Sequence, residues 1–446
     1  MVTASANLYP HLATSETIPI FLSLIQHQNG DIAADMIDIL SQLTEADAVE
    51  NYEEEARVLI GALVDNGLME VLIEALAKMD ESNEEEAKAV YNILSVIENC
   101  IDVMPDVAST VAETTGMLEW LNGRVGPTSI VDSNTQYASE ILAVLLQSGG
   151  EKARLKFGEL GGVDTALRSI APYRSKATQT PEEEEFVENV FDILCAVLME
   201  DAGKRSFLDN EGIELMVLML KGRTLSRTAA LKCLDFATTK FIEACERCVK
   251  KGILPLLFGI CMGKLKILQG DKKKIKRHLE VYEEEEEVRC VSIIANLFIC
   301  LEDESSRDRL LAKFVESEYE KCDRVIEIMI KYAARVSSEE HRIESLFGED
   351  DVDKDEMLLA RMDAGLYTLQ QCALIVAELW ATKDYGLRKR ILMLLHQYEC
   401  TLSFIKGLLD EYLISLGPAE TSADQDGLDN PKAHIARIHD CIKDLE

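Results

Sequence analysis

Residues that interrupt helices are scarce in this sequence. It has 9 prolines and 24 glycines among 446 residues, and Leu, Ala, Glu and Ile are prominent, which indicates an all-helical protein. No apolar run approaches the roughly 20 residues needed to span a bilayer, and the opening "MVTASANLYPHL" lacks the basic region and apolar core of a signal peptide. These absences predict a soluble intracellular protein, built as several domains or as one elongated repeat array.

Positive charge is also in short supply. There are 46 Lys and Arg against 80 Asp and Glu, a formal net charge of −34. Such a charge disfavours nucleic acid and anionic membranes and favours basic partners, although solubility alone would also account for it. The 12 cysteines lie singly in apolar helical patterns, as expected of buried free thiols in a reducing compartment rather than of a disulfide framework.

Motifs of catalysis and metal binding are missing or incomplete. There is no GxSxG or HExxH, and "GELGG" at residues 158–162 follows no strand. Cys245 and Cys248 form a lone CxxC without two further zinc ligands, and the 7 histidines are dispersed. The sequence therefore predicts no catalytic site, no metal and no cofactor, and it indicates a binding protein rather than an enzyme.

One short pattern recurs along the chain. "LIGALVDNGLMEVLIEAL", from Leu59 to Leu76, is apolar at helical spacing but is interrupted at Gly67. Similar breaks fall at Gly116, Gly162, Gly212 and Gly252. A glycine with positive φ can end one helix and let the next begin at a sharp corner. A corner every 40–50 residues predicts an all-α armadillo/HEAT-type α-solenoid, a superhelix of three-helix repeats with less regular C-terminal helices.

This pattern divides the chain into segments. We expect about six armadillo-type repeats over 1–303, a further helical pair at 304–337, an acidic loop at 338–356, C-terminal helices at 357–416, a linker at 417–431 and a terminal helix at 432–446. Within the C-terminal helices, Ala360 to Trp380 is predicted to form one strong helix, in which Gly365 indicates close helix packing.

The third helices line the concave face of an armadillo array, so their polar positions are the candidate binding residues. Alignment on an apolar–Leu pair gives one shared repeat position to Asp38, Asn92, Glu140, Asp192 and Lys232. Polar companions one turn away on the same face are Asp35, Gln42, Lys88, Ser95, Asn99, Gln136, Gln147, Glu185, Glu188 and Asn189. The predicted partner-binding set, called the ladder below, is Asp38, Asn92, Glu140, Asp192, Asp35, Asn99 and Glu188.

Such a ladder predicts a mainly acidic groove that holds an extended basic peptide. Carboxylates would pair with Lys or Arg, and amides would bond the peptide backbone. The alternative is that the polar stripe is only the solvated face of each third helix. The shared register over four repeats favours the ladder.

A cationic block precedes a run of glutamates in "GDKKKIKRHLEVYEEEEEV", residues 270–288. The block resembles a monopartite nuclear-import signal, or a segment able to occupy an acidic groove, and consists of Lys272, Lys273, Lys274, Lys276 and Arg277. The simpler expectation is an exposed loop between two helices of the sixth repeat. Glu283 to Glu287 would then favour the N-terminal end of the following helix.

Several segments together resemble the beta-catenin-like protein 1 family over nearly the whole chain. They are "RMDAGLYTLQ" (361–370), "YASEILAVLLQ" (137–147), "LIGALVDNGL", "LDNEGIELMVLMLK" and "KKKIKR" before an acidic helix. The resemblance implies an armadillo-repeat nuclear protein of the pre-mRNA splicing machinery. It also implies binding to basic, nuclear-localisation-like segments of splicing factors, such as the cell-division-cycle-five-like protein, and of activation-induced deaminase in vertebrates. Family members begin with a long charged extension, whereas this chain starts inside the first repeat.

The expected partners are therefore nuclear proteins with Lys/Arg-rich segments, with no direct contact to nucleic acid and no membrane, while homo-oligomerisation stays open. The alternative function is a nuclear transport adaptor that carries basic-signal cargo. Import receptors of the karyopherin-α type use Trp and Asn on the third helix, but the only tryptophans here are Trp120 and Trp380. This difference favours the splicing scaffold and electrostatic pairing.

Overall fold

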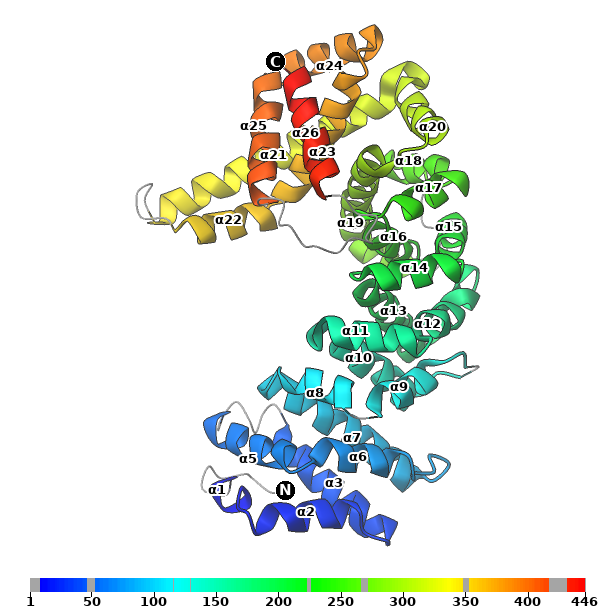
Figure 1. Ribbon diagram of the computed structural model, residues 1–446, viewed down its shortest axis with the longest axis vertical. Coiled ribbons are helices and arrows are strands. Elements are labelled where there is room, and N and C mark those ends of the chain that lie inside the picture. The colour runs from blue at the N-terminus through cyan, green and yellow to red at the C-terminus, as the bar shows by residue number, and fades with distance from the viewer. Residues whose placement is uncertain are drawn as a thin grey trace. The chain divides into compact units, whose positions relative to one another are not determined.

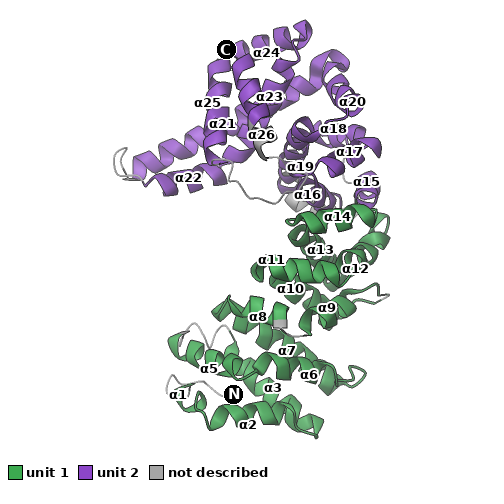
Figure 2. Cartoon of the chain, viewed as in Figure 1, with its two compact units in different colours: residues 1–212 green, residues 213–446 purple. Residues whose placement is uncertain are grey.

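The computed structural model describes residues 9–45, 53–114, 116–128, 130–222, 226–265, 272–347, 353–416 and 431–445. Their regular elements are helices, without a strand among them, and the predicted all-α armadillo-type fold is confirmed. The chain forms two compact units, residues 1–212 and 213–446 (Figure 2). Within the described residues, no helix combines the length and the apolar character needed to cross a membrane.

Unit 1 consists of helices in successive groups of three (Figure 1). The groups are α1 (Tyr9–Leu12), α2 (Thr17–Ile25) and α3 (Gly30–Thr44); α5 (Glu53–Asp65), α6 (Leu68–Leu76) and α7 (Glu84–Val103); α8 (Val107–Thr114), α9 (Met117–Val125) and α10 (Ser133–Ser148); and α11 (Gly150–Glu159), α12 (Gly162–Ile170) and α13 (Pro181–Val197). A 3-10 turn, η1 (Ala171–Arg174), precedes α13, and α14 (Asp201–Asp209) follows it.

The third helices of unit 1 stack side by side, α3 on α7, α7 on α10 and α10 on α13. The leucines on which they were aligned are 1% exposed or less, and they are Leu40, Leu94, Leu142 and Leu194. Burying each leucine contributes about 1.5–3 kcal/mol relative to leaving it in water. Each of the four helices begins at an N-cap residue whose side chain accepts a hydrogen bond from a backbone N–H of the first turn. These N-cap residues are Asn29, Asn83, Asp132 and Thr180. Caps and core therefore fix the same register in successive repeats.

The predicted glycine corners differ in their geometry. Gly67 and Gly252 have φ of 90° and 83°, the left-handed backbone that ends a helix with least strain for glycine. Gly116, in contrast, has φ −80°. Positive φ is thus confirmed at the first and last of the five corners but is wrong for Gly116.

At the two remaining corners the left-handed residue precedes the predicted glycine. Gly161 has φ 72° and Glu211 has φ 58°. Gly162 is needed for a different reason, because a Cβ there would lie 2.3 Å from the ring of Phe157. The same five-residue spacing recurs from Phe207 to Gly212, where the distance would be 2.5 Å. These glycines let the helix start pass over an aromatic ring.

Unit 2 continues with α15 (Gly212–Gly222), α16 (Ser226–Thr238), α17 (Ile242–Lys250), α18 (Leu254–Cys261), α19 (Lys272–Cys300), α20 (Glu304–Val315), η2 (Ser317–Tyr319), α21 (Glu320–Phe347), α22 (Lys354–Asp363), α23 (Leu366–Ala381), α24 (Tyr385–Gln397), α25 (Leu402–Ser415) and α26 (Pro431–Asp444). Helices α16, α19 and α23 stack in that order, and α26 packs on α23 and α25. Helix α23 is buried along nearly its whole length.

The predicted acidic loop at 338–356 is wrong for most of its length. Residues 338–347 continue α21 and 354–356 begin α22, while 348–352 lie outside the described residues. The acidic stretch is stable as helix because its carboxylates have cationic partners. Arg342 bonds Glu339 one turn away, and Arg361 reaches Glu340 at 2.8 Å.

The predicted continuous helix from Ala360 to Trp380 is also wrong. Helix α22 ends at Asp363, and Gly365 has φ 101°, so this glycine forms a corner like that at Gly67. A Cβ at Gly365 would lie 2.4 Å from the ring of Tyr332, which confirms the predicted close packing.

The predicted terminal helix is present as α26, while residues 417–430 of the linker lie outside the described residues. The indole N–H of Trp380 donates to the carbonyl of Asp444 at 2.8 Å, and Arg437 bonds the buried Glu378 at 2.6 Å. Arg307 of α20 bonds the same carboxylate at 2.9 Å. Helix α26 is therefore fixed to unit 2 by polar contacts at both of its described ends.

Candidate partner-binding surface

The first two third helices meet at the Asp38 carboxylate. Asn92 donates to it at 3.0 Å, Gln42 donates at 2.7 Å, and the Lys88 ammonium lies 3.2 Å away. Hydrogen bonding from Lys88, with its charge, lowers the pKa of Asp38. The predicted alignment of Asp38 with Asn92 is therefore a direct contact, and the negative charge of Asp38 is compensated within the chain.

A second contact joins the same two helices about two turns further on. Asn99 donates to the hydroxyls of Thr44 at 3.2 Å and Ser95 at 3.4 Å. Asp35, in the first turns of α3, is exposed. Asn99 thus connects repeats, whereas Asp35 faces solvent.

The contact between α7 and α10 involves residues outside the predicted ladder. Tyr137 donates a hydrogen bond to Glu98 at 2.5 Å, and its ring centroid lies 4.8 Å from that of Tyr91. Tyr137 is buried, whereas Tyr91 is 46% exposed. An aromatic pair therefore lies beside the Glu98 carboxylate.

The Glu140 carboxylate of α10 is influenced by the charges of two further carboxylates, one on each neighbouring third helix. Burial, then the charges of Glu98 on α7 and Glu185 on α13, raise the pKa of Glu140, while a hydrogen bond from Gln136 at 3.2 Å opposes the shift. None of these three carboxylates makes an ion pair with the described residues. We call Glu98, Glu140 and Glu185 the carboxylate cluster; it takes one side chain from each of three successive third helices.

The last predicted members of the ladder lie on α13. Asp192 is half-buried and Glu188 is exposed. A hydrogen bond between α10 and α13 is made by Asn189, which donates to the hydroxyl of Ser139 at 3.1 Å. Lys232, aligned with them in the sequence, belongs to α16 of unit 2.

The predicted alignment therefore holds between α3 and α7, where Asp38 contacts Asn92. Between α7 and α10 the residue that acts on Glu140 is Glu98, which is not at the aligned position. Burial raises the pKa of Glu140, and the charges that raise it further belong to Glu98 and Glu185. Glu98 was missed because the alignment followed a single position in each repeat. Its neighbour Asn99 was in the predicted set, but Glu98 lies six residues after the aligned Asn92, outside the three-, four- and seven-residue spacings that were searched.

The basic block of the predicted import signal lies at the start of α19. The expected loop is wrong for its backbone, which is helical from Lys272, while the side chains of residues 272–280 lie outside the described part. The glutamates after it lie within α19 and not at its N-terminal end. Glu284, Glu286 and Glu287 bind cations of neighbouring helices, namely Arg335, Arg227, Arg324 and Lys331. This glutamate run is structural.

The cysteines are free, and all but the half-buried Cys400 are buried. Burial raises the pKa of Cys248, so the Cys245/Cys248 pair consists of unreactive buried thiols, as the sequence favoured. Among the described residues, no group of three or more His, Cys, Asp or Glu side chains is placed to hold a metal ion.

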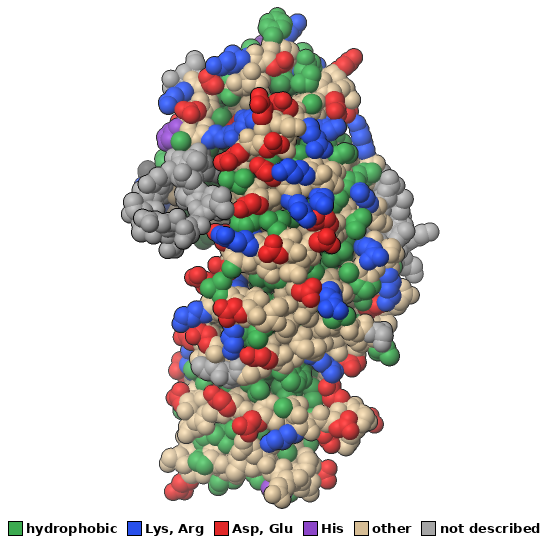
Figure 3. Space-filling model, turned by 45° about the vertical axis from the view of Figure 1, so that its right-hand side comes forward, with side chains coloured by type: hydrophobic (Ala, Val, Ile, Leu, Met, Phe, Trp, Pro, Cys, Tyr) green, Lys and Arg blue, Asp and Glu red, His purple; other side chains and the backbone are tan. Residues whose placement is uncertain are grey.

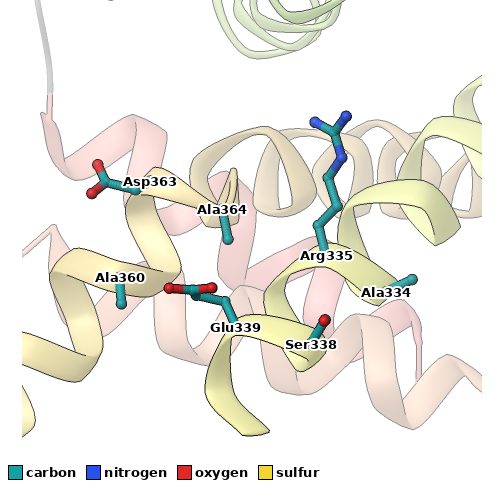
Figure 4. Close-up of a pocket in the computed structure, with 7 residues that line it drawn as sticks. All are labelled: Ala334, Arg335, Ser338, Glu339, Ala360, Asp363 and Ala364. Carbon is teal, nitrogen blue, oxygen red and sulfur yellow. The ribbon is translucent and has the colours of Figure 1, made fainter. Parts of the chain in front are cut away.

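One pocket of about 600 Å³ lies between α21 and α22 in unit 2. Figure 4 shows its lining, with the Arg335 guanidinium pointing away from the Glu339 carboxylate: Ala334, Arg335, Ser338, Glu339, Ala360, Asp363 and Ala364. Figure 3 shows a face on which acidic and basic side chains are interspersed. The excess of negative charge is therefore not gathered into one patch on that face.

Stacked three-helix repeats with a polar third-helix surface define an armadillo-repeat protein. The model of the family described as "Catenin-beta-like, Arm-motif containing nuclear" matches residues 1–410, and the chain belongs to this family. Beta-catenin-like protein 1 of Homo sapiens is 34% identical over 427 residues, which cover 94% of this chain and 74% of the human protein.

A second relative and a solved structure are also similar to this chain. The beta-catenin-like protein 1 homolog of Schizosaccharomyces pombe is 33% identical over 411 residues, covering 91% of this chain and 69% of that protein. A chain solved in work on the interaction between cadherin and beta-catenin is 11% identical, covers 96% of this chain and 99% of its own length, and has a TM-score of 0.36.

Proposed function

We propose that this chain is a nuclear scaffold of the pre-mRNA splicing machinery that binds Lys/Arg-rich, nuclear-localisation-like segments of splicing factors through the third-helix surface of unit 1. Nuclear location is supported by the description of the family as nuclear. The splicing role is supported by the sequence resemblance to the beta-catenin-like protein 1 family. In this proposal the chain binds partner proteins and does not catalyse a reaction.

The observation that carries this proposal is the carboxylate cluster. Burial and the charges of Glu98 and Glu185 raise the pKa of Glu140, so the negative charge of Glu140 is repelled by two neighbours in the free protein. A Lys or Arg side chain from a partner would offset that repulsion and would form charge-assisted hydrogen bonds. Asp38 is less suited to this role because Lys88 already compensates it.

The spacing of the third helices suits an extended peptide. Packed helices lie about 8–10 Å apart, and an extended chain advances about 3.3 Å per residue. Basic residues two or three positions apart in the peptide could therefore reach successive helices. The half-exposed ring of Tyr91 offers a flat surface to a neighbouring cation or apolar side chain.

Binding of a labelled Lys/Arg-rich peptide to the full chain, followed by fluorescence anisotropy, tests the surface. We expect the Glu140→Lys/Asp192→Lys double variant to bind at least about tenfold more weakly, since two favourable charge interactions become repulsive. Affinity should also fall as salt rises. Unchanged affinity in a variant with wild-type circular dichroism would rule the surface out.

A pulldown from nuclear extract at low and high salt tests the cellular role. We expect splicing factors with basic segments in the low-salt eluate and their loss at high salt, read by mass spectrometry. Recovery of import receptors in place of splicing factors would support a transport adaptor and contradict the proposal.

A further inference from the structure

The C-terminal half of α21 and helix α22 form a hairpin in unit 2. Residues 334–347 and 353–364, here the α21–α22 hairpin, extend beyond the neighbouring helices of the unit (Figure 2). The pair lies between the first part of α21 and the buried α23, as an insertion between core helices. Insertions of this kind in repeat proteins often serve binding.

The hairpin is held rigidly at its base. Arg361 of α22 binds Glu411 of α25 through both terminal nitrogens and reaches Glu340 of α21 at 2.8 Å. The Asp353 side chain caps the start of α22 by accepting from the N–H of Asp355 at 3.1 Å. The outer face of α22 is therefore a fixed surface.

That outer face is apolar. Leu358, Leu359 and Met362 are 46%, 67% and 45% exposed, and their i, i+1, i+4 spacing places them on one side of the helix. Leu346, near the end of α21, adds a fourth side chain at 62% exposed. Four large apolar residues on one hairpin exceed the scattered single exposures expected of a surface.

Carboxylates surround this apolar face. Asp355, Glu356 and Asp363 are exposed and make no ion pair with the described residues. The arginines of the hairpin are already committed: Arg335 to Glu284, Arg342 to Glu339, and Arg361 as above. The exposed Lys354 also lies beside Leu358, one turn before it, but three carboxylates outnumber it. The hairpin thus offers apolar contact within a rim of net negative charge.

The pocket of Figure 4 adjoins this rim. Ala334, Ala360 and Ala364 line it together with Ser338 and Arg335. The carboxylates of Asp363 and Glu339 border it, and Glu339 is already bound to Arg342. A long, thin cationic side chain fits such a space better than a bulky apolar one, because its stem meets alanine and its charge meets the Asp363 carboxylate.

We propose that the outer face of α22, with Leu346 and the adjoining pocket, is a docking surface for a basic amphipathic helix of a partner protein. Its apolar face would cover Leu358, Leu359 and Met362, and its Lys or Arg side chains would lie over Asp355, Glu356 and Asp363. The charge of the rim selects this partner over an acidic one. The surface lies in unit 2 and is separate from the carboxylate cluster of unit 1.

The test uses the full chain and a fluorescein-labelled, 18-residue amphipathic peptide of Leu and Lys as the probe. Titrations are made in the Glu140→Lys/Asp192→Lys background, so that the carboxylate cluster does not capture the probe. We expect Leu358→Gln/Leu359→Gln/Met362→Gln to weaken binding about tenfold or more, and Leu359→Gln alone about threefold. Failure of this test leaves the function of unit 1 untouched.

A matched control comes from the same unit. Leu392, Met393 and Ile414 are 48%, 47% and 81% exposed on α24 and α25, and their replacement by Gln should change affinity less than about twofold. Equal loss in both triple variants, or no loss in the first, would overturn the proposal. It would also be overturned if the wild-type chain were a dimer by light scattering and the α22 variant a monomer, because the occupant would then be a second copy.

Discussion

The hydroxyl of Tyr137 donates a hydrogen bond to Oε2 of Glu98 at 2.5 Å, and this contact joins the third helices of two successive repeats. It fixes the Glu98 carboxylate near Glu140, whose pKa is raised in part by the charge of Glu98. A structural contact therefore positions one member of the surface proposed to bind basic segments.

Removal of the Tyr137 hydroxyl tests whether its hydrogen bond to Glu98 stabilises the contact between the two helices. Tyr137→Phe should lower the free energy of unfolding of unit 1 by about 1–2 kcal/mol, because a part-buried hydrogen bond to a carboxylate is lost. Trp120 is the tryptophan of unit 1, so its fluorescence during denaturation of a Trp380→Phe protein reports that unit. Tyr91→Phe, on an exposed ring, is the control; an equal loss there would contradict the assignment.

Neutralising Glu140 should stabilise the free protein. Its pKa is raised in the folded state, so the folded state holds the proton more tightly, and stability is lost as pH rises from the unfolded pKa of about 4.3 through the folded value. Glu140→Gln should raise the Tm of unit 1 by about 1–3 °C at pH 7. The gain should vanish below about pH 4, where both proteins are uncharged at this position. A lower Tm at pH 7 would show that Glu140 is compensated by a cation.

The buried ion pair of Arg227 and Glu286 should dominate the stability of the contact between α16 and α19. Their side chains are 2% and 6% exposed, and two hydrogen bonds of 2.6 Å join them. Arg227→Met should cost about 3–5 kcal/mol because Glu286 is left buried and unpaired. The loss of unfolding free energy is measured by Trp380 fluorescence during denaturation of a Trp120→Phe protein. Arg227→Met/Glu286→Met should cost clearly less, and a double variant at least as unstable as the single one would refute this.

The glycine over an aromatic ring should not tolerate a side chain. In Gly212→Ala the new Cβ would lie 2.5 Å from Phe207, so the chain must shift, at a cost of about 1–3 kcal/mol. Gly123→Ala on α9 is the control, since nothing lies within 4 Å of its Cβ position and alanine favours helix. The Tm values of the two variants are compared by thermal unfolding, and we expect the lower Tm for Gly212→Ala. Equal Tm values would disprove the steric requirement at Gly212.

The repeat architecture could be predicted from sequence because its signals are local. Gly67 ends a helix through its own backbone conformation, and Leu40 and Leu94 are buried at the aligned position. The same local reasoning placed Asp38 opposite Asn92, which is a direct contact.

The rest depended on contacts between distant segments. The acidic stretch after residue 337 has the composition of a loop, because the sequence does not show that Glu340 pairs with Arg361 of the next helix. Glu98 gains its role only through Tyr137, 39 residues away, and the glutamates of α19 are internal because cations of other helices reach them. A sequence pattern shows which residues share a face, but not which face of a neighbouring helix meets it.

The most direct measurement is the affinity of a Lys/Arg-rich peptide for two variants of equal net charge. In one, Glu98, Glu140 and Glu185 become Gln; in the other, the exposed Glu54, Glu70 and Glu159 of α5, α6 and α11 become Gln. We expect binding about tenfold weaker or more in the first variant and within about twofold of wild type in the second. Equal weakening in both would contradict it, because binding would then follow net charge and not the carboxylate cluster.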